Sequence, residues 1–145
     1  MQTLKLLAVP VLMLLPAIAP AQGLERASAP ADARVYFISP NDGEAVSSPV
    51  TIRFGLDGMG VAPAGVNQEH TGHHHLLINV DESNMPPMDR PLPTSDNVVH
   101  FGGGQTEVSI ELEPGQHTLQ LMLGDFRHVP HDPAVMSEKI TITVE

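Results

Sequence analysis

Apolar and polar residues alternate along several short stretches of this chain, and no stretch follows the period of a helix. In residues 50–57 every second side chain is Val, Ile, Phe or Leu. Residues 139–144 alternate in the same way, with isoleucine and valine on one face and threonine on the other. Successive side chains of a strand point to opposite faces, so both stretches predict strands with one buried face.

Seven such strands are predicted, separated by turns rich in glycine, proline, asparagine and aspartate. They cover residues 34–39, 50–57, 73–80, 97–101, 106–113, 117–123 and 139–144. This pattern favours an all-β fold, a single immunoglobulin-like antiparallel β-sandwich of about seven strands. A jelly-roll-like or open-barrel variant fits the same pattern, because the strand count alone does not assign strands to sheets.

The first 33 residues differ in character from the rest. Residues 1–21 combine Lys5, an apolar run and a small-residue cleavage pattern, which is typical of a secretory signal peptide. Residues 22–33 are small and polar, and we expect a flexible leader there, followed by the β-sandwich domain over residues 34–145. This organisation predicts a periplasmic or secreted protein that is not inserted in a membrane after signal cleavage.

The composition narrows the classes of function. The 145-residue chain has no cysteine, no tryptophan and a net charge of −10 at pH 7. Without cysteine, the chain has no disulfide, thiol nucleophile or thiolate metal site. The acidic balance repels nucleic acid and anionic lipid headgroups, so neither is an expected partner. With few aromatic residues, a platform that stacks bases or sugars is not expected either.

Eight histidines are the unusual feature, and the predicted topology gathers six of them at one end. In an immunoglobulin-like sandwich the loops after the second, fourth and sixth strands lie at the same pole. The candidate metal ligands expected at this pole are His70, His73, His75, His100, His128 and His131, with oxygen donors from Glu69, Asp125 or Asp132.

The residue types point to a borderline metal. His73 and His75 share one face of their strand, about 7 Å apart at Cα, and both rings can tilt toward one ion. Imidazole suits zinc and copper, so we expect a Cu or Zn ion and no organic cofactor. Met59 and Met136, expected at the same pole, would favour Cu(I) as soft thioether donors.

The histidines also have structural interpretations. His74 shares its face with the apolar residues of its strand, which predicts a core histidine bonded to backbone or to a carboxylate. His73 and His75 fit a solvated strand face as well as a ligand pair. His117, at the opposite pole, is predicted to anchor a strand corner through polar contacts. For His100, at a strand end, and for His128 and His131, in a loop, a ligand role and a structural role both remain open.

Two further stretches are interpreted as ordinary loops. Residues 81–96 contain four prolines and predict a long irregular connection. Its Met85 and Met88 are expected at the opposite pole, in contact with solvent. Gly102–Gly104 predicts a tight turn and not a phosphate cradle, because the lysine and helix of such a cradle are missing.

Four blocks of the sequence carry a family resemblance. They read TGHHHLLINVD, DNVVHFGGGQTE, PGQHTLQLMLGD and HVPHDPAVMSEKITITV. Together they resemble a bacterial family of small secreted proteins that is catalogued as a domain of unknown function. The resemblance covers roughly residues 34–144 and implies export and a compact β domain. It supplies no established activity, so the candidate site depends on the residues themselves.

Three functions compete. The leading hypothesis is an exported periplasmic metal-binding module, a copper or zinc carrier or buffer that uses the histidine pole. The alternative is a metal-free module that recognises another cell-envelope protein through a histidine-rich, pH-sensitive surface. An enzyme ranks last, because the chain shows no Ser-His-Asp arrangement and no cofactor motif. Glu69, beside His70, is the one acid–base candidate we identify.

Overall fold

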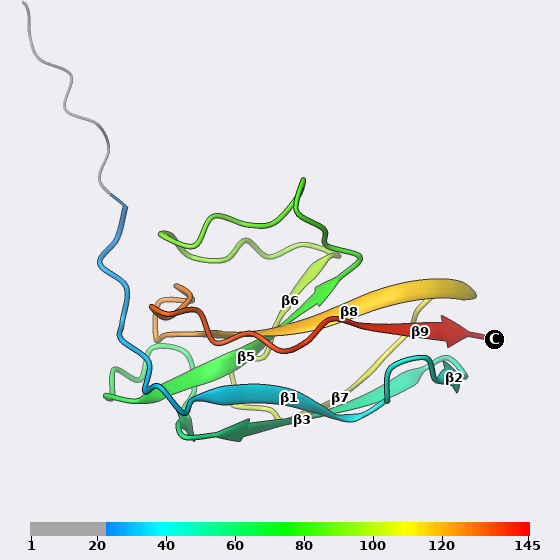
Figure 1. The fold of residues 1–145 in the computed structure, drawn as a ribbon, viewed down its shortest axis with the longest axis horizontal. Coiled ribbons are helices and arrows are strands. Elements are labelled where there is room, and N and C mark those ends of the chain that lie inside the picture. The colour runs from blue at the N-terminus through cyan, green and yellow to red at the C-terminus, as the bar shows by residue number, and fades with distance from the viewer. Residues whose placement is uncertain (1–22) are drawn as a thin grey trace, which may run out of the picture.

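A computed structural model describes residues 23–145, which form two β-sheets packed face to face (Figure 1). The smaller sheet has the strand order β1-β3-β7 and is antiparallel throughout. Its strands are β1 (Arg34–Ser39), β3 (Val50–Asp57) and β7 (Glu107–Ile110). The expected signal peptide at residues 1–21 lies outside the described residues. No helix within residues 23–145 has the length and apolar character needed to cross a membrane.

The larger sheet has six strands in the order β2-β9-β8-β5-β4, with β6 also paired to β5. They are β2 (Ala45–Val46), β4 (Gly60–Val61), β5 (Thr71–Ile78), β6 (Val98–His100), β8 (Gly115–Gly124) and β9 (Ile140–Val144). The long pairs β5–β8 and β8–β9 are antiparallel, whereas the short pairs β2–β9 and β4–β5 are parallel. Strand β5 therefore lies inside the sheet.

The prediction of an all-β, two-sheet fold is confirmed. The seven predicted strands correspond to β1, β3 and β5 to β9, with ends that agree to within about three residues. The structure adds β2 and β4, which have two residues each and are too short to produce a detectable alternation. A purely antiparallel sandwich was expected. These two short strands pair in parallel, so the observed sandwich is antiparallel only in its longer strand pairs.

The main core fills the space between the two sheets. Apolar residues from β1 and β3 meet those from β5, β8 and β9 there, at the positions that alternation assigned to the buried faces. The most deeply buried of them are Ile52, Phe54, Leu76, Leu119, Leu121, Leu123 and Ile142. Removing such a side chain from water stabilises the fold by about 1.5–3 kcal/mol. This core fixes which face of β5 and β8 is left for the histidines.

The other face of the larger sheet is covered too. Residues 81–97 fold across it, on the side away from β1 and β3 (Figure 1). A second, smaller core forms beneath this loop from Leu77, Val80, Leu92, Val98 and Met122, with Met85, Met88 and Met136 packed against it. Met85 and Met88, expected to face solvent, are partly buried against this core, whereas most of the loop is exposed as predicted. Strand β5 is buried on both faces from Gly72 to Ile78.

The expected flexible leader runs beside the loop that follows β8. The amide of Ala29 donates to the carbonyl of Asp132 at 3.2 Å, and the amide of Asp132 donates to the carbonyl of Ala27 at 2.8 Å. The guanidinium of Arg26 donates to the carbonyls of Pro130 and His131. Residues 23–33 are thus bonded to the loop that carries His128.

Candidate metal centre

Three imidazoles converge on the outer face of the larger sheet. Strand β5 contributes His73 and His75, and the loop after β8 contributes His128. The Nδ1 atom of His128 lies 2.8 Å from Nε2 of His73 and 3.3 Å from Nε2 of His75. One ring nitrogen from each of the three lies within 4.8 Å of the other two. The convergence joins positions 53 and 55 residues apart in the chain.

These separations fit a metal ion. Nitrogen ligands about 2.0–2.1 Å from a tetrahedral zinc ion lie about 3.3–3.4 Å from one another. Two of the separations are 2.8 and 3.3 Å, and the third is within 4.8 Å, so ring movements that make the three separations more equal would accommodate an ion. The three imidazoles form a neutral nitrogen donor set that leaves a fourth coordination position open. Such a set suits zinc and copper.

Register explains why the β5 rings reach this point. His73 and His75 are two residues apart on one strand, so their side chains share a face. In the β5–β8 ladder His73 lies opposite Gly124 and His75 opposite Met122. A Cβ atom at Gly124 would lie 2.5 Å from Cε1 of His75. The glycine therefore leaves the space that the His75 ring occupies.

A buried carboxylate shapes the loop that carries His128. One oxygen of Asp125 accepts hydrogen bonds from the amides of Arg127 at 2.7 Å and Val129 at 3.0 Å. The other oxygen accepts from the Arg127 guanidinium at 2.8 Å. His128 adopts a φ of 65° within this turn, and its amide donates to the Asp125 carbonyl at 2.9 Å. Asp125, expected as an oxygen donor to the metal, instead holds the turn that aims His128 at β5.

The environment keeps the three rings neutral. Burial, reinforced by neighbouring imidazoles, lowers the pKa of His73 to about 4 and that of His75 to about 2. Burial and the nearby His100 also lower the pKa of His128. All three rings are therefore in the form that binds metals at pH 7. Within the described residues, Nδ1 of His73 and of His75 has no hydrogen-bond partner. These two atoms are not part of the three-nitrogen group, to which both rings contribute Nε2.

His100 closes one side of the cluster. It lies directly opposite His75 in the β5–β6 ladder, and the two ring centroids are 4.4 Å apart. Its centroid is 4.8 Å from that of His128. However, its Nε2 donates to the carbonyl of Pro93 at 2.9 Å. His100 therefore packs on the three-nitrogen group and is tied to the loop of residues 81–97.

Two predicted ligands lie apart from this group. The buried ring of His131 faces the carbonyls of Thr71 at 3.2 Å and Leu123 at 3.5 Å. The His131 ring also lies over Gly72. Gly72 is on one face of β5, and the side chains of His73 and His75 are on the other, so the sheet separates His131 from the three-nitrogen group. His70 precedes β5, and its side chain is 52 % exposed and 3.5 Å from the carboxylate of Glu69.

The remaining two histidines have structural positions, as predicted. His74 is fully buried in the main core, with its ring 4.8 Å from that of Phe54. The hydrogen bonds expected for its ring nitrogens are not formed with any described residue. His117 anchors its corner, because Nε2 donates to the Glu113 carbonyl at 2.8 Å and Nδ1 accepts from the Asn79 amide at 3.0 Å.

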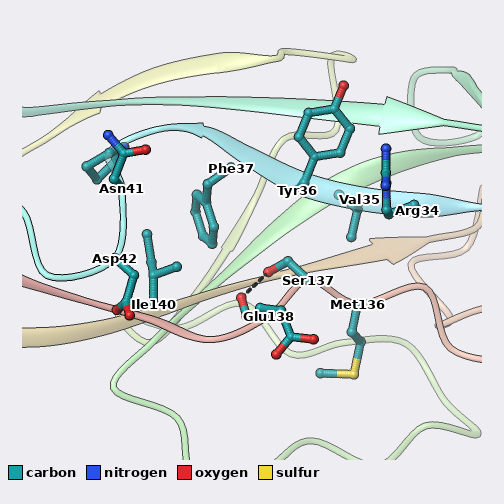
Figure 2. Close-up of a pocket in the computed structure, with 11 residues that line it drawn as sticks. Arg34, Val35, Tyr36, Phe37, Asn41, Asp42, Met136, Ser137, Glu138 and Ile140 are labelled. Atoms are coloured by element: carbon teal, nitrogen blue, oxygen red, sulfur yellow. Dashed lines mark hydrogen bonds between the residues drawn. The ribbon is translucent and has the colours of Figure 1, made fainter.

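The cavities at the surface lie away from the three imidazoles. One of about 320 Å³ opens between β1 and residues 136–140, where Val35, Phe37 and Ile140 line it (Figure 2). Another, of about 240 Å³, is polar and is lined in part by His70 and His131. Neither contains a member of the three-nitrogen group. In that group, His73 and His75 are buried beneath the loops, and His128 is half-buried.

The fold and the cluster together define a small β-sandwich with a buried three-histidine centre. The chain belongs to the family of the domain of unknown function DUF4399, whose model matches residues 52–145. The matched range includes all eight histidines and agrees with the resemblance seen in the four sequence blocks. Comparisons with curated proteins and with solved structures gave no match.

Proposed function

We propose that this protein binds one copper or zinc ion through ring nitrogens of His73, His75 and His128. One observation carries the proposal. Three imidazoles from two distant segments place a nitrogen each within 4.8 Å of one another; His73 and His75 are fully buried, and His128 is half-buried. In two of these contacts, at 2.8 and 3.3 Å, ring nitrogens face each other within hydrogen-bond distance.

The role that fits this site is that of a carrier or buffer in the periplasm. Three neutral ligands leave a coordination position open for a further donor group. The net charge of −10 attracts cations to the surface. The signal-like residues 1–21 favour an exported protein.

Burial of the cluster argues against the metal-free alternative. A recognition surface needs accessible side chains, whereas His73 and His75 are fully buried. His70 is exposed, but it stands alone beside Glu69. A histidine-rich docking surface therefore has little support.

Calorimetric titration of the purified, untagged protein tests the proposal. With Zn(II) or Cu(II) we expect one equivalent to bind, and the double variant His73→Ala/His75→Ala should weaken binding by more than about tenfold. His70→Ala is the matched control, since it removes an exposed histidine outside the cluster, and it should bind like the unchanged chain. Absence of heat with Zn(II), Cu(II), Cu(I) and Ni(II) would overturn the proposal.

A further inference from the structure

We propose that the ion held by this site is copper, and that Met122 supplies a sulfur donor for its Cu(I) form. This inference rests on the proposed metal site and names the ion and a fourth donor. Met122 was not considered as a ligand in the sequence analysis. It nevertheless lies on the same face of the sheet as the histidine cluster.

The position of Met122 follows from register. His75 lies directly opposite Met122 on β8 and directly opposite His100 on β6. The three residues thus form one row across three strands, with His75 in the middle. Side chains directly opposite in a ladder have Cβ atoms about 4.5–5.5 Å apart. Met122 is fully buried, so its side chain lies away from solvent, on the face of the sheet that His75 shares.

The other methionines of this region pack against the same apolar core as Met122. Of the five methionines in residues 23–145, four pack in the second core and only Met59 packs against the main one. Met136 pairs with Met122 through an isolated bridge. Its side chain points away from Val35 and Phe37 of β1 (Figure 2), toward the outer layer. The second core also includes Leu77 and Val98, two residues from His75 and His100 on the same face.

The chemistry of a thioether decides between the two metals. Methionine sulfur is a soft ligand that favours Cu(I), whereas imidazole suits copper and zinc alike. The chain has no cysteine, so methionine provides its only soft donors. Methionine is also a common filler of apolar gaps. These two roles differ in what they predict, because a filler can be replaced by leucine without changing which metal binds.

The test compares Met122→Leu with the unchanged protein. Leucine keeps the volume and apolar character of methionine, so folding should be retained. Cu(I) affinity is measured anaerobically against a chromogenic Cu(I) chelator, and Zn(II) affinity against a chromogenic Zn(II) chelator. We expect Cu(I) affinity to fall by at least about tenfold and Zn(II) affinity to stay within about twofold. Met59→Leu, in the other core, is the matched control and should change neither affinity.

A second measurement examines the ligands of the ion directly. X-ray absorption of the Cu(I)-loaded protein should show nitrogen ligands and one sulfur scatterer, and the sulfur should be lost in Met122→Leu. Unchanged Cu(I) affinity in that variant, a parallel loss of Zn(II), or a shell without sulfur would each overturn this inference. If Zn(II) still requires His73 and His75 in those cases, the proposed metal site stands. If neither ion binds the unchanged protein, both proposals fail.

Discussion

His73 and His74 are neighbours in sequence, yet they serve opposite layers of the molecule. His73 points to the outer face of β5, where its Nε2 meets another imidazole at 2.8 Å. His74 points into the main core against Phe54, and no described residue bonds to its ring. Parity along the strand was enough to predict this division. It could not predict that the outer face would be buried, since that depends on loops with no periodic pattern.

The buried ring of His74 makes the fold sensitive to acid. Burial lowers its pKa to about 4, whereas in the unfolded chain the ring has an ordinary pKa near 6.5. Between these values the unfolded state binds more protons, so stability is retained above about pH 6.5 and lost as the pH falls toward 4. We expect His74→Leu to lessen this loss, by about 2 kcal/mol between pH 7.5 and pH 5.

Urea unfolding of the metal-free protein at both pH values measures the effect. Leucine has a similar volume and no ring nitrogen to protonate, so the variant should show the shallower dependence of unfolding free energy on pH. His70→Ala, which changes an exposed ring, should follow the unchanged chain. Equal pH dependence in His74→Leu and the unchanged chain would contradict the expectation.

At the scale of elements, the sequence predicted the strands better than the connections between them. Alternation located β3 and β9 to within about a residue, because a half-buried strand must repeat every two positions. The loop of residues 81–97 has no such constraint, so its place over the sheet could not be predicted. The six expected ligands divide for the same reason. His131 and His128 belong to one loop, but a turn aims their rings at different faces of β5.

Asp125 sets that turn, and its removal should weaken the metal site without touching a ligand. Asp125→Ala deletes the acceptor for the amides of Arg127 and Val129, so His128 is no longer held toward β5. We expect Zn(II) affinity to fall by at least about tenfold. Asp125→Asn retains a side-chain oxygen that can accept both bonds and should restore most of the affinity.

Direct titration with Zn(II) compares these variants. Asp132→Asn is a useful control, because it removes an exposed carboxylate from the same loop. If Asp125→Asn binds as poorly as Asp125→Ala, the effect comes from lost negative charge and not from the shape of the turn. Unchanged affinity in Asp125→Ala would show that His128 is positioned by other contacts.

For the whole molecule, an ion at this site would join the outer layer to the sandwich. His73 and His75 belong to β5 in the middle of the larger sheet, whereas His128 lies on a loop bonded to the leader through Arg26 and neighbouring backbone groups.

A ligand that binds only the folded state stabilises it by RT ln(1 + [L]/Kd), or about 2.7 kcal/mol at a hundredfold excess over Kd. For a domain of this size that corresponds to a rise in Tm of about 10 °C. Thermal melts with and without Zn(II) should show this rise, and excess chelator should reverse it. The rise should be absent from His73→Ala/His75→Ala and present in His70→Ala. An equal rise in the double variant would place the ion elsewhere on the protein, because those two rings would then contribute nothing to the stabilisation.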